Sequence, residues 1–308
     1  MQRWHYAHSG VTIASELELP EWSHCETGSG WEDPDVMVRL ESPQAESTGQ
    51  NQSEEVTQRN VVTATEYRLL IPKVGHFHVR DGREIRVSPL PGVQSAIVRP
   101  WVLGPVWGAL CYQRGFFIVH ASAVRIDNEA VIFCGRAGRG KSTLAAQLGI
   151  RGYALVSDDL CRLDLPAQGT PVVYPSPPRV KLWSDTLGEL GWGARELAPD
   201  HLREGKFHLS MGETGLIDPL PVRAAYLLAW GEFGVRELHG MAALHEFLSG
   251  ATYRMRMLES MGQVGTHSRR CMEFLRYVPF AELTKPRDFS ASPRTLDFLA
   301  DRLSNTPV

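Results

Sequence analysis

The segment from Gly135 to Ser142 has the sequence GRAGRGKS and matches the phosphate-binding pattern G-x-x-x-x-G-K-[ST] at every fixed position. Glycines let the backbone curl so that successive N–H groups point at phosphate oxygens, and the dipole of the following helix favours negative charge there. Lys141 would then reach the β- and γ-phosphates of a nucleotide, and the Ser142 hydroxyl would ligate Mg²⁺. The predicted cofactors are therefore ATP and Mg²⁺. The predicted nucleotide-binding residues are Gly135, Arg136, Ala137, Gly138, Arg139, Gly140, Lys141, Ser142 and Thr143.

A pair of carboxylates, Asp158 and Asp159, follows this loop after a short helix and a short strand. In a parallel sheet the carboxyl ends of adjacent strands lie along one edge, so we expect both aspartates beside the loop. Phosphoryl transfer uses one carboxylate to hold Mg²⁺ and another to accept the proton of an attacking hydroxyl. Neighbouring side chains on an extended strand point to opposite faces, so the two should differ in role unless the chain turns there. The alternatives are an ordinary Asp-Asp turn that caps a strand and a chance match of the loop.

The elements that must position these residues are indicated by apolar runs and turn signals from Gly115 onward. The stretch AVIFC at 130–134 predicts a strand before the loop, and 141–150 predicts a helix after it. Strand, loop, helix and strand in this order are typical of a parallel, nucleotide-binding α/β core. Further predicted elements are strands at 116–124, 154–156 and 223–230, a turn at Asp127-Asn128, helices at 240–249, 251–262 and 267–276, and a last helix from Ser292 to Leu303.

The N-terminal part of the chain has the texture of a β module. The segments 77–80 and 84–87 alternate apolar and polar residues on either side of Asp81-Gly82, which is a strong hairpin signal. Residues 41–60 are almost entirely polar and cannot bury enough surface to offset their ordering entropy. They predict a mobile loop inserted between strands.

Residues 93–114 have a helical pattern that contains Pro100 and Pro105. Proline kinks or splits a helix, so we expect two short helices there. The sequence therefore predicts two domains, a β-rich N-terminal module at 1–114 and an ATP-binding domain at 115–308.

The composition excludes several classes of protein. The chain of 308 residues has 35 acidic and 32 basic residues and a net charge of −3, which argues against a broad basic face for nucleic acid. Its apolar runs are far shorter than the roughly 20 residues of a membrane helix, and the opening MQRWHYAHSG lacks the apolar region of a signal peptide. Five widely separated cysteines without a CxxC pair fit free buried thiols better than disulfides or a zinc site. We expect a cytoplasmic protein with neither nucleic acid nor membrane as a partner.

The run GRAGRGKSTLAAQLGIRGYALVSDD resembles the core of the bacterial HPr kinase/phosphorylase family. In that family a phosphate loop, a short helix, an R-G dipeptide and a strand ending in Asp-Asp follow at this close spacing. Phosphoenolpyruvate carboxykinases share the fold more distantly, so the resemblance implies an α/β P-loop core of this type with a smaller β-rich N-terminal domain. It implies Asp158 as the general base, Asp159 as a Mg²⁺ partner and Lys141 as a catalytic cation. It also points to His120 as a histidine that closes the site, whereas the alternative is a core histidine on a strand.

Two segments outside this core bear on the acceptor. The downstream segment PSPPRVKLW departs from the family's glycine-rich signature, which helps the reverse, phosphorolytic reaction. The opening HYAHSGVTIASELELPEW is instead similar to the HPr-kinase-like proteins of lasso-peptide biosynthesis. That resemblance implies a kinase for the side chain of the C-terminal residue, usually serine, of a precursor peptide. Because family members form oligomers, a homo-oligomer is also expected. The alternatives are an HPr-type protein serine kinase, a small-molecule or carboxykinase-like enzyme, and a nucleotide-binding regulatory module without kinase activity.

A few residues outside these motifs are secondary candidates. The candidate phosphate contacts are Arg179, Lys181 and Lys206. A kinase needs cations to neutralise charge on the transferred phosphoryl group, and the alternative for each is solvated surface charge. His76 and His78 could bind a metal together, although a polar hairpin face is the favoured interpretation. One of the eight tryptophans, which include Trp101, Trp107 and Trp183, could stack on adenine.

Overall fold

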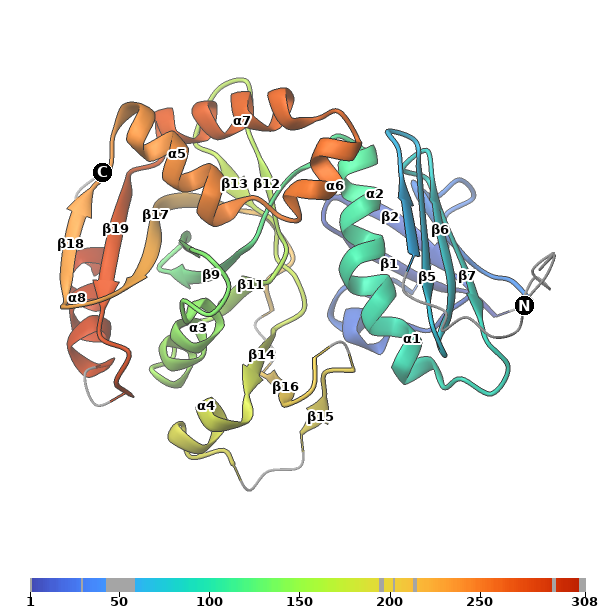
Figure 1. Cartoon of the computed structure of the whole chain (residues 1–308), viewed down its shortest axis with the longest axis horizontal. Helices are drawn as coiled ribbons and strands as arrows, with labels where there is room; N and C mark the ends of the chain where they lie inside the picture. The colour runs from blue at the N-terminus through green and yellow to red at the C-terminus, as the bar shows by residue number, and fades with distance from the viewer. Residues whose placement is uncertain are drawn as a thin grey trace. The chain divides into compact units, whose positions relative to one another are not determined.

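The computed structural model describes residues 2–28, 30–42, 59–193, 197–201, 203–212, 215–289 and 292–304 of the chain. The chain forms two compact units (Figure 1). Unit 1 is Met1–Phe116 with Arg254–Val264, and unit 2 is Phe117–Tyr253 with Gly265–Val308. The predicted boundary at 114/115 leaves the segment 254–264 in the second domain, whereas the structure groups that segment with unit 1.

Unit 1 is built on a mixed sheet whose seven described strands have the order β1-β2-β3-β7-β6-β5-β4. The strands are β1 (Trp4–His8), β2 (Val11–Ser15), β3 (Val36–Leu40), β4 (Arg59–Val62), β5 (Glu66–Ile71), β6 (Gly75–Arg80) and β7 (Glu84–Pro89). The predicted hairpin is confirmed, because β6 and β7 pair antiparallel around a turn in which Asp81 and Gly82 have φ angles of 51° and 62°. The strands β3 and β4 flank the polar segment, of which residues 43–58 lie outside the described residues.

The predicted histidine pair lies on this hairpin. His76 and His78 belong to β6, and His78 Nε2 lies 3.6 Å from a carboxylate oxygen of Glu66 on the neighbouring β5. This contact favours the interpretation of the two histidines as a polar hairpin face.

The helical exit of unit 1 is less broken than the two prolines predicted. Its parts are α1 (Ser95–Trp101), a π-helical segment η2 (Val102–Val106) and α2 (Trp107–Gln113). Figure 1 shows α1 and α2 as one helical run. Pro105 lies inside the π-helical segment, where the wider turn accommodates a residue without an N–H donor, so the helix continues instead of splitting.

The segment that returns to unit 1 contains α6 (Met255–Ser260). Directly after this helix, Gln263 Nε2 donates a hydrogen bond of 3.0 Å to the backbone carbonyl of Tyr112 in α2. Met257 and Leu258 are buried. These contacts explain why the segment groups with unit 1 although it follows the phosphate loop in the sequence.

Unit 2 contains a mixed sheet with the order β11-β9-β10-β17-β13-β12-β8, on which β19 pairs with β17 and β18 with β19. Its strands are β8 (Phe117–Val119), β9 (Ala121–Ile126), β10 (Glu129–Cys134), β11 (Leu155–Asp158), β12 (Cys161–Asp164), β13 (Val172–Val173), β17 (Leu220–Trp230), β18 (Gly234–Glu237) and β19 (Phe280–Lys285). The predicted parallel core is only partly correct: β10, β17 and β19 run parallel, but β9 is antiparallel to both β10 and β11. The apolar run 116–124 forms two strands that separate at His120.

Helices cover the two faces of this sheet. They are α3 (Lys141–Ile150), α5 (Gly240–Ala251), α7 (Val264–Tyr277) and α8 (Ser292–Ser304), close to the predicted ranges. One buried cluster joins Ile132 of the sheet to Phe247 of α5 and Phe274 of α7. The other joins Phe133, the next residue of the same strand, to side chains of α3 and α8 such as Leu144. Because successive residues of β10 point to opposite faces, both clusters hold the strand that leads into the phosphate loop.

A small separate sheet completes unit 2. It has the order β14-β16-β15 and consists of β14 (Arg179–Trp183), β15 (Ala198–Pro199) and β16 (Lys206–Ser210), with α4 (Ser184–Glu189) after β14. All five cysteines of the chain are free and buried, as predicted. Among the described helices, none is long and apolar enough to cross a membrane.

Candidate nucleotide-binding and catalytic site

The phosphate loop connects β10 to α3 through three glycines with positive φ angles. The angles are 141° at Gly135, 81° at Gly138 and 81° at Gly140. A Cβ atom at Gly135 would lie 3.0 Å from the carbonyl oxygen of Leu228, and one at Gly140 would lie 3.0 Å from the ring of Trp230. Both backbone angle and space therefore require glycine at these two positions, which is what a tightly curled anion-binding loop needs.

Lys141 is the first residue of α3, and its side chain turns back into the loop. Its Nζ donates a hydrogen bond of 2.7 Å to the carbonyl of Gly135, and the residue is only 7% exposed. Burial lowers the pKa of this ammonium group from its ordinary value. A phosphate in the loop would replace the carbonyl as its partner and restore a full opposite charge.

Asp158 ends β11 and lies beside the loop. Its carboxylate accepts hydrogen bonds from Ser122 Oγ at 2.5 Å and from Ser142 Oγ at 2.9 Å. Burial raises the pKa of Asp158 to about 6, the negative charge of Asp159 adds to the rise, and the two serine hydroxyls oppose it. The group is thus a carboxylate whose pKa lies close to neutrality.

The position of Asp158 follows from the strand between β10 and β11. Both strands are antiparallel to β9, so they point in the same direction and end at the same edge. Ser122 of β9 pairs with Phe133 on one side and with Asp158 on the other. The aspartate reaches the loop as expected, but across an antiparallel strand that the sequence analysis did not place there.

Asp159 follows with a φ angle of 73°, so the chain turns at this residue and the two carboxylates separate. One of its oxygens lies 3.4 Å from His120 Nε2 and the other 3.8 Å from Lys181 Nζ. Burial acts to raise the pKa of Asp159, but electrostatic interactions with Lys181, His120, Arg203 and Lys206 oppose it, and the net effect is a lowered pKa. Asp159 is therefore the more acidic member of the pair.

His120 joins β8 to β9 and lies in contact with Asp159, which favours a role in the site over that of a core histidine. Its backbone N–H donates to the carbonyl of Ala251 at 2.7 Å, which fixes the residue against α5. Burial lowers its pKa to about 4, and the charge of Lys141 acts in the same direction. The imidazole is therefore neutral at physiological pH.

The small sheet supplies the predicted cations. Lys181 lies between Asp159 and the buried Asp200, whose carboxylate is 3.9 Å from its Nζ. Lys206 stacks on Trp183 with its Nζ 5.0 Å from the ring centroid, and burial lowers the pKa of Lys206. Arg179 precedes Lys181 by two positions on β14, so both belong to the same face of the strand.

Several residues of this site had no signal that sequence reasoning used. Ser122, Asp200, Arg203 and His208 are isolated polar residues without a motif, and His208 Nε2 lies 3.8 Å from Asp200. In the loop, Arg136 is exposed and Arg139 half-buried. Only the fold brings the four isolated polar residues, Ser122, Asp200, Arg203 and His208, near the two aspartates.

Trp230 and Lys285 form a second pair that the sequence analysis missed. They end the parallel neighbours β17 and β19, and Trp230 Nε1 donates a 3.1 Å hydrogen bond to the carbonyl of Gly138. Lys285 Nζ lies 4.0 Å from the centre of the Trp230 ring and 3.3 Å from where a Cβ of Gly140 would be. Lys285 is 7% exposed, and burial lowers its pKa to about 8. The strand β19, which ends at Lys285, has the mixed sequence FAELTK and was not among the predicted strands, so no signal in the sequence pointed to this lysine.

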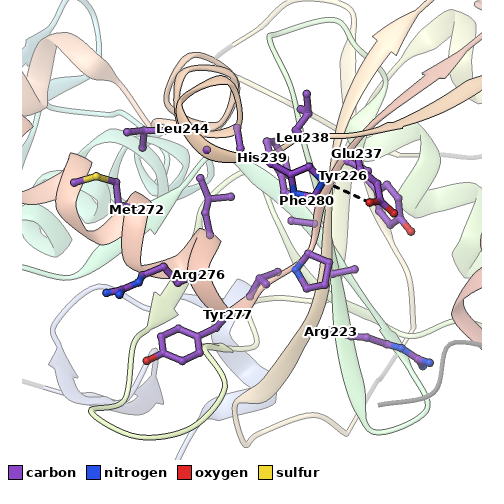
Figure 2. A pocket seen from close by; sticks show the side chains of 18 of the residues that line it. Arg223, Tyr226, Glu237, Leu238, His239, Leu244, Met272, Arg276, Tyr277 and Phe280 are labelled. Carbon is purple, nitrogen blue, oxygen red and sulfur yellow. Dashed lines mark ion pairs between the residues drawn. The ribbon is translucent and has the colours of Figure 1, made fainter.

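A cavity of about 800 Å³ lies at the other end of the same two strands. It is lined by the amino-terminal halves of β17 and β19, including Tyr226 and Phe280, and by α5 and α7. Figure 2 shows its side chains, with His239 and Glu237 forming an ion pair of 3.5 Å. Because Arg223–Tyr226 precede the residues of β17 that contact the loop, this cavity is separate from the glycine loop.

The comparisons with known proteins add little to this geometry. No family model and no curated protein matches the chain. Among solved structures, the Hpr(Ser) kinase/phosphatase from Coxiella burnetii matches 60% of this chain and 95% of its own, with 13% sequence identity and a TM-score of 0.32. So distant a likeness carries no argument about fold or activity, and the function rests on the residues of the site.

Proposed function

We propose that this protein is an ATP-dependent kinase that transfers the γ-phosphoryl group to a serine hydroxyl of a peptide, with the C-terminal residue of a lasso-peptide precursor as the first candidate acceptor. One observation carries the proposal of phosphoryl transfer: the Asp158 carboxylate accepts a hydrogen bond from Ser142. Ser142 directly follows the loop lysine, and the glycines of that loop have the backbone angles that phosphate binding requires. The peptide acceptor rests on the resemblance of the N-terminal opening alone.

The residues present fit ATP with Mg²⁺. Lys141 and the N–H groups of the loop would hold the phosphates. The oxygens of Ser142, Asp158 and Asp159 are the hard ligands that Mg²⁺ prefers, and the ion would neutralise charge on the β- and γ-phosphates. Lys181, Lys206 and Arg203 add positive charge near Asp159 and would stabilise the transferred phosphoryl group.

Asp158 is the better candidate for the general base. A base is most effective when its pKa lies near the operating pH, and the pKa of Asp158 is raised to about 6 whereas that of Asp159 is lowered. Asp159 would then act as the Mg²⁺ partner, with neutral His120 beside it. The contact between Ser142 and Asp158 leaves a second arrangement in which Asp158 also touches the ion.

The test compares Asp158→Asn with Asp159→Asn in the full chain, with Asp164→Asn, an exposed aspartate at the end of β12, as the matched control. Phosphate transfer to peptides ending in serine is followed by mass spectrometry, and ATP binding by calorimetry. If Asp158 is the base, the variant Asp158→Asn abolishes transfer, retains ATP binding and leaves the Mg²⁺ dependence of ATP binding unchanged. If Asp158 is instead a ligand of the ion, the same variant raises the Mg²⁺ concentration required for ATP binding. Transfer that survives in Asp158→Asn would contradict the base assignment.

The acceptor is tested in the same assay with free HPr protein and with small hydroxyl compounds. Phosphate on HPr but on no peptide terminus would replace the lasso-peptide acceptor by an HPr-type one. ATP binding without transfer to any acceptor would favour a regulatory nucleotide-binding module. A homo-oligomer and a cytoplasmic location stay predictions.

A further inference from the structure

Unit 1 contains a cluster of two histidines and a cysteine that the proposed kinase chemistry does not use. His8 ends β1, and His24 and Cys25 end the 3₁₀ helix η1 (Pro20–Cys25). One ligand atom from each of the three residues lies within 4.8 Å of the other two. His8 is 5% exposed, Cys25 is 7% exposed and His24 is half-buried. In the described part of the chain, no fourth His, Cys, Asp or Glu joins this group.

Two imidazole nitrogens and a thiol sulfur are a ligand set for zinc. The usual Zn–N and Zn–S distances hold such atoms about 3.3 to 3.7 Å apart around a tetrahedral ion. From a separation of up to 4.8 Å, the ligand atoms would move together by on the order of 1 Å when the ion binds. Mg²⁺ and Ca²⁺ prefer oxygen ligands, so the ion at this cluster would differ from the one at the phosphate loop. Three protein ligands leave one position for water.

Ring contacts position the two histidines of the cluster. The His8 ring packs on Trp22 and on Trp107, with centroid distances of 4.7 and 5.5 Å. Its Nε2 lies 3.2 Å from Ser9 Oγ, a contact of the kind that orients a metal-bound imidazole through its other nitrogen. The rings of His8 and His24 meet edge to face, with centroids 6.4 Å apart.

The thiol of Cys25 is already directed by its neighbours. Its Sγ donates to the carbonyl of Trp22 at 3.2 Å. Burial raises the pKa of Cys25 to about 12, so the thiol stays protonated and unreactive without a metal ion. When zinc binds, the S–H bond breaks, the sulfur keeps the electron pair for the metal and one proton is released to solvent.

We propose that His8, His24 and Cys25 form a Zn²⁺ site in unit 1, with water as the fourth ligand. The ion joins the end of β1 to the end of η1 and stabilises the fold of the β-rich unit, because the ligands come together only in the folded chain. The sequence carries no zinc signal, because only one of the three ligands is a cysteine. The ligands also come from two separate elements, β1 and η1.

The test uses the full-length chain, stripped of metal and free of nucleotide, titrated with Co²⁺. A cobalt–thiolate bond gives a charge-transfer absorption that oxygen ligands do not give, so Co²⁺ at the phosphate loop does not produce the signal. We expect the band to saturate at one equivalent and to disappear when Zn²⁺ displaces Co²⁺. Zn²⁺ is expected to raise the Tm of the stripped protein by about 5 °C or more.

Variants assign the signal to the cluster. Cys25→Ser is expected to lose the band, and His24→Ala to weaken Co²⁺ binding by at least about tenfold. Cys111→Ser, which changes a buried cysteine of α2 in the same unit, and His76→Ala, a histidine of the hairpin, are expected to keep wild-type binding. Should Cys25→Ser not fold, His24→Ala carries the same test at a half-buried position.

A wild-type chain without a charge-transfer band, or a band that Cys111→Ser removes and Cys25→Ser keeps, would overturn the zinc site. Neither measurement involves ATP or phosphate transfer. A failure here therefore leaves the kinase proposal standing, and a failed kinase assay leaves the zinc site standing.

Discussion

The two ends of β17 and β19 differ sharply, although the same pair of strands builds both. At the carboxyl ends, Trp230 and Lys285 lie against the glycine loop, and buried charges gather beside them. At the amino ends the same strands line the cavity of Figure 2, where the Arg302–Glu237 ion pair of 3.3 Å is largely exposed. A nucleotide's phosphates need fixed N–H dipoles and cations. The carboxyl end offers both around the glycine loop, whereas the cavity holds the guanidinium groups of Arg223, Arg276 and Arg302 among largely apolar side chains.

The largest expected difference between the two ends comes from removing the loop lysine. Lys141→Ala is expected to lower phosphate transfer by about 10²- to 10³-fold, because the ammonium group, which donates to the Gly135 carbonyl inside the loop, would face the charge that develops on bound phosphates. Arg276→Ala at the exposed edge of the cavity serves as the control and is expected to leave transfer within about twofold of wild type. Steady-state kinetics on both variants measure the contrast. Equal losses would mean that the cavity takes part in the reaction.

A smaller effect is expected at Lys285. Lys285→Met is expected to weaken ATP binding by about 10- to 100-fold, the range for losing a hydrogen bond to a charged group. The same variant should raise the Tm of the nucleotide-free protein, since a buried cation stacked on Trp230 costs desolvation energy. Calorimetric ATP titration and thermal unfolding measure the two quantities. Arg302→Met, at the opposite end of the two strands, is the control. It should neither weaken ATP binding nor raise the Tm of the nucleotide-free protein.

The smallest effect concerns stability at Asp158. The folded-state pKa of about 6 lies above the ordinary value of 3.8, so the folded chain binds an extra proton between these values and loses stability as the pH rises through this window. Asp158→Asn keeps an oxygen that can accept from Ser122 and Ser142 but carries no charge. The variant should unfold a few degrees higher than wild type at pH 8 and close to it at pH 4. A Tm below that of wild type at pH 8 would contradict the pKa assignment.

Activity should follow the same ionisation. A base must be deprotonated, so transfer by the wild type is expected to fall as the pH drops through about 6. A pH profile of kcat measures this.

Local patterns predicted the parts of the molecule that depend on few neighbours. The hairpin at Asp81-Gly82, the helix at 141–150 and the glycines of the loop were predicted correctly, because positive φ angles and helical periodicity are properties of short segments. The π-helical segment at Pro105 was missed, since its stability comes from packing of the buried Val102 and Val106 and not from local preference.

The aspartate pair was predicted in part: its place in the sequence pattern was recognised, but its contacts depend on distant segments. The sequence placed Asp158 at the end of a strand, but the antiparallel insertion of β9 decided that Ser122 contacts it. The left-handed turn at Asp159 decided that its carboxylate meets His120 and Lys181.

The sequence by itself determined the phosphate loop, its flanking strand and helix, and the two aspartates as candidates for chemistry, because each is a contiguous pattern with a local physical cause. Only the tertiary structure decided which side chains join them. Lys285 and Ser122 come from strands that are separate in the chain from the loop and the aspartates. In unit 1, the proposed zinc ligands His8, His24 and Cys25 likewise come from two separate elements. Strand order and register bring such residues together through long-range pairing, and that pairing leaves no spacing in the sequence that could be recognised.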